Sequence, residues 1–211
     1  MTTTLILWGT LSFVLSFVLT LFVRRLAIHF RIIDEPGLLR KIHSRPVALL
    51  GGVAIFVAIA ACVIGILISS DLLTAGEINP RHYIGVLIGG LILMIGGFID
   101  DRFELPPRLA IIAPILAALT AIGFGIEVDK LSNPLGGQMI LAGWQSDILV
   151  FVWLLVVMYT TKFLDGLDGL ATSVTSVGAL MVMLLSLTVV YFQPDVAILS
   201  AVTLGAFIGF L

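Results

Sequence analysis

Long apolar segments recur along the whole chain and alternate with short segments that hold most of its charges. A helix rises about 1.5 Å per residue, so about 20 apolar residues cross the roughly 30 Å hydrocarbon core of a bilayer. Hydrophobic residues make up 60% of the 211 residues and charged residues only 11%, which excludes an ordinary soluble domain. The sequence therefore predicts an all-α fold, a multi-pass transmembrane helical bundle. The expected spans are residues 4–23, 48–69, 83–99, 108–126, 147–162 and 168–190, with 196–211 as a possible seventh.

Other local features refine this prediction. The first apolar run precedes its positive charges and lacks a small-residue cleavage site, so it reads as a retained helix rather than a signal peptide. Span 147–162 is short, so we expect it to be tilted or enclosed by neighbours. Segment Gly125 to Asp147 contains two short apolar stretches about a Gly-Gly turn, which predicts a small hairpin. The single cysteine, Cys62, lies in an apolar run and is expected to pack there.

The positive charges indicate an orientation. Nine of the eleven Lys and Arg residues follow the first, third and fifth spans. The other two, Arg81 and Lys130, follow the second and fourth spans. By the positive-inside rule, the N-terminus is outside and segments 24–47, 100–108 and 162–168 are cytoplasmic. The net charge of −2 gives no basic field for a nucleic acid partner. No repeat or linker divides the chain, so residues 1–211 are expected to form a single integral-membrane domain.

Carboxylates gather in the same cytoplasmic segments, and the clearest case is Asp100 with Asp101 directly after the third apolar run. Adjacent carboxylates repel each other, and a divalent cation between them would keep both ionised, with oxygen ligands suiting Mg²⁺. The alternative is a hydrated helix end. An acid at a helix C-terminus opposes the macrodipole by about 0.3–1 kcal/mol, which makes the pair slightly costly without a function.

Two further segments carry candidate residues. In the stretch 162–173, Asp165 and Asp168 are either capping residues at a helix start or ligands, and the free N–H groups there, with Lys162 nearby, suit an anion. In the stretch 34–52, the basic group Arg40, Lys41, His43 and Arg45 can neutralise phosphate, although such charges beside a bilayer also serve topology alone. Bases and carboxylates on one membrane face suit a phosphate ester with Mg²⁺ and a lipid substrate.

Three stretches in this order carry a resemblance to a known family: "DEPGLLRKIHSRPVALLGGVAI", "GGFIDDRFELPPR" and "FLDGLDGLATS". They resemble the cytoplasmic motifs of the polyprenyl-phosphate N-acetylhexosamine-1-phosphate transferases, glycosyltransferase family 4, which also includes the muramoyl-pentapeptide translocase. The Arg-Lys-x-His-x-x-Pro form is more similar to the GlcNAc-1-phosphate branch. The resemblance implies a bacterial plasma-membrane enzyme with a cytoplasmic active face, which transfers a sugar 1-phosphate from a UDP-sugar to undecaprenyl phosphate and releases UMP.

The resemblance also implies roles for individual residues. Asp100 and Asp101 match the pair assigned to the lipid-phosphate acceptor and the metal, Mg²⁺ or Mn²⁺, and one of them would deprotonate or orient the acceptor phosphate. Asp165 and Asp168 match carboxylates that line the nucleotide-sugar cleft, with Asp168 as a further metal ligand. Arg40, Lys41 and His43 match a basic motif near the phosphates. Both direct displacement and a covalent phospho-enzyme stay open, as does a homodimer.

The chain departs from the family in two ways. Asparagines usually stand six and three positions before the first aspartate of the third motif, whereas Tyr159 and Lys162 stand there here, and Lys162 could instead meet a diphosphate. The chain also corresponds to about the N-terminal two thirds of a ten- to eleven-span fold, so we expect a fragment truncated at its C-terminus, with little activity on its own. The alternatives are a truncated non-catalytic membrane protein of the same fold and an ion-coupled transporter, which usually places carboxylates near the membrane midplane.

Overall fold

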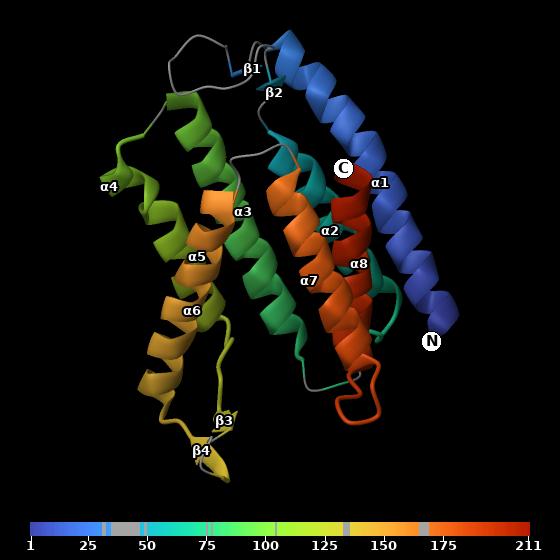
Figure 1. Cartoon of the computed structure of the whole chain (residues 1–211), viewed down its shortest axis with the longest axis vertical. Coiled ribbons are helices and arrows are strands. Elements are labelled where there is room, and N and C mark those ends of the chain that lie inside the picture. The colour runs from blue at the N-terminus through green and yellow to red at the C-terminus, as the bar shows by residue number, and fades with distance from the viewer. Residues whose placement is uncertain are drawn as a thin grey trace. The chain divides into compact units, whose positions relative to one another are not determined.

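The computed structural model describes residues 1–30, 50–74, 76, 78–103, 105–132, 136–164 and 169–211, with the backbone of residues 33–34 and 47–48. The described residues are mostly helical (Figure 1). They form two compact units, Met1–Ile78 with Thr172–Leu211, and Asn79–Ala171. The elements in chain order are α1 (Thr2–His29), β1 (Ile33–Asp34), β2 (Val47–Ala48), α2 (Gly51–Ser69), α3 (Pro80–Phe103), α4 (Pro107–Ala110), α5 (Ile112–Gly123), β3 (Lys130–Ser132), β4 (Gln138–Ile140), α6 (Gly143–Leu164), α7 (Leu170–Ser186) and α8 (Pro194–Phe210).

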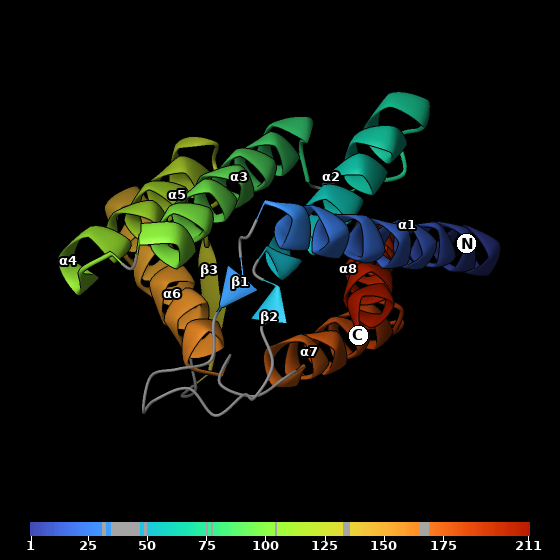
Figure 2. The same cartoon turned by 90° about the horizontal axis from the view of Figure 1, so that it is seen from above.

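In the first unit, α1 packs against both α8 and α2 (Figure 2). Ser12 Oγ donates to the carbonyl of Val202 and Ser16 Oγ to that of Ala206, each over 2.7 Å. Both contacts join positions 190 residues apart, so α1 and α8 run in the same direction. Since a bilayer core supplies no water to these hydroxyls, carbonyls on the neighbouring helix are their natural partners.

Small residues allow α1 and α8 to approach closely. Gly205 and Gly209 form a Gly-x-x-x-Gly pattern on α8, and a side chain at either one would meet the α1 backbone at Gly9 or Phe13. Ala201, Val202 and Ala206 are buried in the same contact, and Ala54, Ala58 and Cys62 are buried along α2. The packing role expected for Cys62 is therefore confirmed. Close backbone contact is the usual way in which membrane helices associate, because lipid tails are as apolar as the side chains.

A buried acid marks the start of α8. Asp195 is only 3% exposed and lies in the first helical turn, where a negative charge is favoured by the helix macrodipole. Its Oδ1 accepts a hydrogen bond from the backbone of Val196 over 2.9 Å. Gly76, in the connection after α2, lies directly against the same carboxylate. The backbone N–H of Gln193 donates to the carbonyl of Ser186 over 2.9 Å and closes the turn between α7 and α8.

In the second unit, α3 and α5 are antiparallel neighbours, and α5 packs on α6. Their direction follows from the contacts, since Gly85 lies against Phe124 and Gly96 against Ala113. Arg81 Nη2 also donates to the carbonyl of Gly123 over 2.7 Å and ties the start of α3 to the end of α5. Because α6 in turn opposes α5, α3 and α6 run in the same direction and end at the same end of the unit (Figure 1).

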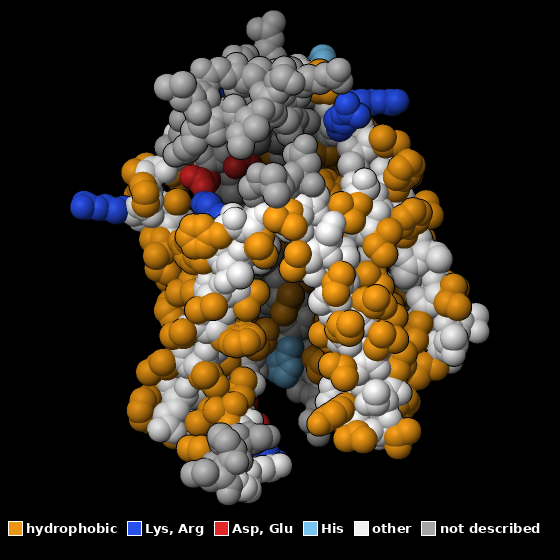
Figure 3. All heavy atoms as spheres, in the orientation of Figure 1, with side chains coloured by type: hydrophobic (Ala, Val, Ile, Leu, Met, Phe, Trp, Pro, Cys, Tyr) orange, Lys and Arg blue, Asp and Glu red, His pale blue; other side chains and the backbone are white. Residues whose placement is uncertain are grey.

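Several sequence expectations are confirmed. Each expected span overlaps helical residues, with 108–126 divided between α4 and α5, and α1, α2, α3 and α6 are long and apolar enough to cross a membrane. Figure 3 shows the visible flanks of the helices covered with hydrophobic side chains, as a lipid environment requires. The expected hairpin in 125–147 is present, with Lys130 paired to Ile140 and Ser132 to Gln138. The shorter helices are α7, α8 and the segment Pro107–Gly123, and their membrane crossing stays a prediction.

Other expectations need correction. The span expected at 108–126 is broken into α4 and α5 at Ile111, because Pro114 has no N–H to donate to the carbonyl of Ala110. The span expected at 147–162 is not short, since α6 has 22 residues. Within the part of the chain that the structure describes, neighbours bury only Ser146 and Val150 of α6, and its tilt stays a prediction. Besides the expected hairpin β3–β4, the described residues contain a short antiparallel ladder that the sequence did not predict, the pairing of Ile33 with Ala48 in β1–β2.

Candidate active site

The carboxylate pair lies inside a helix rather than after it. The sequence interpretation placed Asp100 and Asp101 where the apolar helix stops, but α3 continues through both to Phe103. The helix ends there because Pro106 and Pro107 follow, and the residue before a proline is driven to extended backbone. Arg102 stands in the same last turn, where a cation offsets the negative end of the helix macrodipole.

The helical backbone separates the two carboxylates. Successive residues of an α-helix point about 100° apart, so neighbouring side chains do not face each other. The Asp100 side chain is 25% exposed and faces α6, while Asp101 is exposed. The carboxylates of the two acids therefore point in different directions around the helix. A cation bound by both would lie beside the helix end, between these two directions.

Lys162 provides the counter-charge of Asp100. Its Nζ lies 2.9 Å from Asp100 Oδ2, at both hydrogen-bond and ion-pair distance. Lys162 stands in the last turn of α6, and it reaches Asp100 because α3 and α6 end together. The lysine side chain is 58% exposed, and an ion pair this open to solvent contributes only about 0.2–1 kcal/mol, less at high salt. The pair therefore adds little to the stability of the fold.

Tyr159 stands one turn before Lys162 on α6, so the two side chains lie on the same side of the helix. Its ring packs at a tilt against Phe163, with ring centroids 6.4 Å apart. These are the two positions where the family resemblance would have asparagines. In this chain the two positions hold an aromatic ring and a flexible cation, and the cation contacts Asp100.

The remaining predicted site residues lie outside the described part of the chain. These are Arg40, Lys41, His43, Asp165 and Asp168. Their roles, including the choice between capping and ligand binding for the two acids, stay predictions. α7 itself begins at Leu170, after Gly169 in the left-handed region with φ of +74°.

The donor chemistry at the α3 end fits a hard divalent cation. Mg²⁺ typically uses one or two protein carboxylates and fills its other positions with water and substrate phosphates. Asp100 and Asp101 supply that number. Among the residues that the structure describes, no group of three or more His, Cys, Asp or Glu side chains converges to form a complete protein cage.

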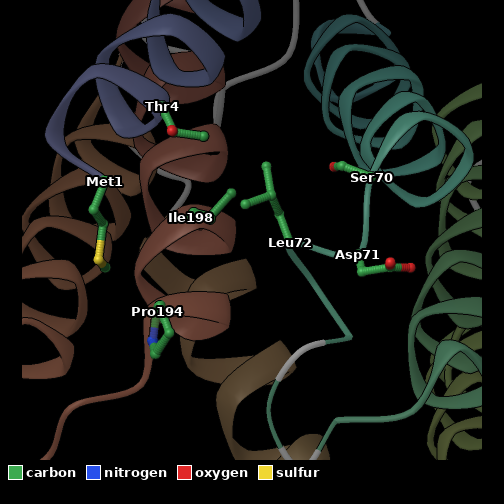
Figure 4. A pocket seen from close by; sticks show the side chains of 7 residues that line it. All are labelled: Met1, Thr4, Ser70, Asp71, Leu72, Pro194 and Ile198. Atoms are coloured by element: carbon green, nitrogen blue, oxygen red, sulfur yellow. The ribbon is translucent and has the colours of Figure 1, made fainter.

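A hollow in the first unit has a different character. It has a volume of about 460 Å³ and lies between the start of α1, the end of α2 and the start of α8. In Figure 4 the side chains of Leu72 and Ile198 face each other across it, while the carboxylate of Asp71 points away from them. With mainly apolar walls, this hollow contains none of the predicted site residues.

One relationship at the site was not anticipated from the sequence. Lys162 was expected to meet a diphosphate, and its pairing with Asp100 was missed. The charge pattern indicated part of this relationship, because the positive-inside rule puts the ends of α3 and α6 on the same side of the membrane. The charge pattern does not show that both helices pack on α5, and this packing brings the two ends together.

Comparison with known proteins adds the family. Residues 83–211 match the model of glycosyl transferase family 4. A decaprenyl-phosphate N-acetylglucosaminephosphotransferase of Mycolicibacterium smegmatis is 31% identical over 98% of this chain and 52% of its own length. A probable undecaprenyl-phosphate N-acetylglucosaminyl 1-phosphate transferase of Bacillus subtilis is 27% identical over 92% of this chain and 51% of its own.

A third relative, an undecaprenyl-phosphate alpha-N-acetylglucosaminyl 1-phosphate transferase of Thermotoga maritima, is 26% identical over 82% of this chain and 48% of its own length. The chain thus spans about half the length of the relatives it matches. The matched region includes most of α3, with its carboxylate pair, and all of α6, with Lys162. The family model covers more than half of the chain, and the chain therefore belongs to glycosyl transferase family 4.

Proposed function

We propose that this chain is part of an enzyme that transfers N-acetylglucosamine 1-phosphate from UDP-N-acetylglucosamine to undecaprenyl phosphate, initiating synthesis of a cell-envelope glycan. The names of its relatives support the polyprenyl-phosphate acceptor and the sugar phosphate. The observation that carries the proposal is the meeting of Asp100 and Lys162 at the ends of two apolar helices. On this proposal the helix ends lie at the membrane surface, where a lipid phosphate held in the bilayer presents its charge.

The proposed reaction is a phosphoryl transfer. An oxygen of the lipid phosphate forms a bond to the sugar-linked phosphorus of the donor, the bond from that phosphorus to the bridging oxygen breaks, and UMP leaves with that oxygen. Such reactions depend on positioning and on neutralising charge rather than on protein covalent chemistry. Mg²⁺ or Mn²⁺, when bound, supplies positive charge against the diphosphate.

We assign roles to the chain's own residues on this basis. Asp100 and Asp101 hold the cation and orient the acceptor phosphate, with Asp168 as a third proposed ligand. Lys162 and the basic group Arg40, Lys41 and His43 neutralise the phosphates of the substrates. Asp165 and Asp168 line the nucleotide-sugar side. The proposed location is the bacterial plasma membrane, with the N-terminus outside and this site on the cytoplasmic face, as the charge pattern indicates.

The test is transfer of radiolabelled sugar phosphate to polyprenyl phosphate in membranes that contain the complete gene product. Asp100→Asn and Asp101→Asn each remove a charge with little change in shape, and we expect losses of two orders of magnitude or more. Asp147→Asn, near the opposite end of α6, is the matched control and should retain full activity. Near-normal transfer by both site variants would reject the proposed role, and no transfer by the unchanged protein would favour a non-catalytic member of the family.

A further inference from the structure

We propose that Lys162 is a positioning residue that occupies Asp100 as an internal counter-ion and yields the carboxylate when a divalent cation binds. This inference rests on the proposed function, because it concerns the same acids. The new element is that Lys162 alternates between two partners. It pairs with the Asp100 carboxylate before the cation binds and with the phosphates of the donor afterwards.

The geometry of the pair supports competition. Lys162 Nζ donates to Asp100 Oδ2 over 2.9 Å, so the ammonium already uses one of the oxygens that a cation would need. A hard cation binds such an oxygen at about 2.0–2.1 Å, and a positive ammonium beside it would be repelled. Binding of a cation to Asp100 therefore weakens its ion pair with Lys162, and the ion pair weakens binding of the cation.

The exposure of the pair supports exchange. The Lys162 side chain is 58% exposed and Asp100 25%, so the ion pair is open to solvent and weakly held. Lysine carries its charge on a flexible four-carbon stem with three rotatable donors, so it can leave one oxygen and reach another within the same neighbourhood. An asparagine at this position would carry no charge and could not act as a counter-ion.

The pair also has a positional effect. Lys162 belongs to the last turn of α6 and Asp100 to the last turn of α3, and α5 packs between the earlier parts of these helices. Their contact links the end of α6 to the end of α3 while no cation is bound. Release of Lys162 frees an ammonium for the donor diphosphate at the moment when the carboxylate takes the cation.

The first test measures binding of Mn²⁺ alone to the purified protein by electron paramagnetic resonance of the free ion. Lys162→Met keeps the length of the side-chain stem and removes its charge. Lys130→Met in β3 is the matched control, because Lys130 lies away from Asp100 and Asp101. We expect Lys162→Met to bind Mn²⁺ about two- to fivefold more tightly than the unchanged protein, since an exposed ion pair is worth about this factor. Lys130→Met should leave the affinity unchanged.

The outcomes are decisive in either direction. Equal or weaker Mn²⁺ binding by Lys162→Met would overturn the competition, as would the absence of Mn²⁺ binding by all three proteins. If affinity is unchanged while Asp100→Asn abolishes sugar-phosphate transfer, the proposed function stands and this inference fails. If Lys162→Met binds more tightly while both aspartate variants keep their activity, the competition stands and the catalytic role fails.

A second test needs no substitution. A water-soluble carbodiimide joins a carboxylate and an amine in contact through an amide, and peptide mass spectrometry can identify the Asp100–Lys162 link. We expect this link in metal-free protein and a severalfold lower yield in millimolar Mg²⁺, compared with NaCl at the same ionic strength to account for screening. An equal yield in both salts, or no link in metal-free protein, would contradict the inference.

Discussion

Ser12 and Val202 join α1 to α8 through a hydrogen bond of 2.7 Å from the serine hydroxyl to the backbone carbonyl. One turn further along, Ser16 repeats the contact with Ala206 at the same distance. Both serines are fully buried, so water does not compete for their hydroxyls. The two contacts fix the relative position of two parallel helices that small residues bring together.

Replacing these serines should loosen the first unit. We expect Ser12→Ala and Ser16→Ala each to lower the free energy of unfolding by about 0.6 kcal/mol, and at most about 1.7 kcal/mol, which is the range for hydrogen bonds between membrane helices. Ser176→Ala is the matched control, because its hydroxyl bonds the carbonyl of Thr172 within its own helix. Denaturant titration in detergent micelles measures all three, and equal stability across them would show that the helix-to-helix bonds contribute nothing.

Substituting the glycines of α8 by alanine should lower the stability more than substituting the serines. A Cβ at Gly205 would lie 3.1 Å from the carbonyl carbon of Gly9, and one at Gly209 would lie 3.0 Å from that of Phe13. Backbone atoms cannot rotate away as a flexible side chain can, so the helices must separate. We expect Gly205→Ala and Gly209→Ala each to cost about 1–3 kcal/mol, the usual range for overpacking.

Gly178→Ala on α7 is the control for these variants, because nothing lies within 4 Å of the added Cβ in the described structure. Alanine favours a helix over glycine by about 0.8–1.0 kcal/mol, so this substitution should leave stability unchanged or raise it. A loss of stability at Gly178 equal to that at Gly205 would mean that the close approach of α1 and α8 is not the cause.

Gly76 should be similarly restricted, by the side chain of Asp195 rather than by backbone atoms. A Cβ there would lie 3.0 Å from Cγ of Asp195, whose side chain is buried and cannot move toward water. We expect Gly76→Ala to lower the thermal unfolding midpoint, and the loss to shrink in an Asp195→Ala background, where the obstructing carboxylate is absent. A loss of the same size in both backgrounds would place its cause elsewhere.

The sequence predicted the helices well because a membrane demands long apolar runs, and these are visible without knowledge of packing. It predicted the hairpin at Lys130–Ile140 from the Gly-Gly turn, which marks a position that needs positive φ, as Gly136 and Gly137 both show. It misplaced the end of α3, since an acid pair after an apolar run reads as a boundary although the backbone continues to Phe103. Termination by the following prolines was the better signal.

The contact between the predicted site residues Asp100 and Lys162 could not be predicted from the sequence. Asp100 and Lys162 are 62 positions apart, and their contact depends on how α3 and α6 pack on α5. Those helices touch mainly through apolar and small residues, such as Gly89 against Ala117, which carry no distinctive signal in one sequence. The buried Asp195 was missed for the same reason, because nothing around it in the chain shows that Gly76 covers it.

The arrangement of the second unit gives a prediction about the membrane itself. α6 has 22 residues and a length of about 33 Å, enough to cross a bilayer once. Lys130 lies in the hairpin before α6, and Lys162 lies in its last turn. The two lysines should therefore be on opposite sides of the membrane, with Lys162 in the cytoplasm by the positive-inside rule.

Single cysteines at these positions, in a Cys62→Ala background, can be labelled in intact cells with a maleimide that does not cross membranes. We expect Lys130→Cys to react from outside and Lys162→Cys only after the cells are opened. Asp101→Cys should behave like Lys162→Cys, because α3 and α6 end together, and the cysteine-free protein gives the background. Labelling of 130 and 162 from the same side would contradict a single crossing by α6, whereas a complete exchange of sides would reverse the orientation and leave the fold intact.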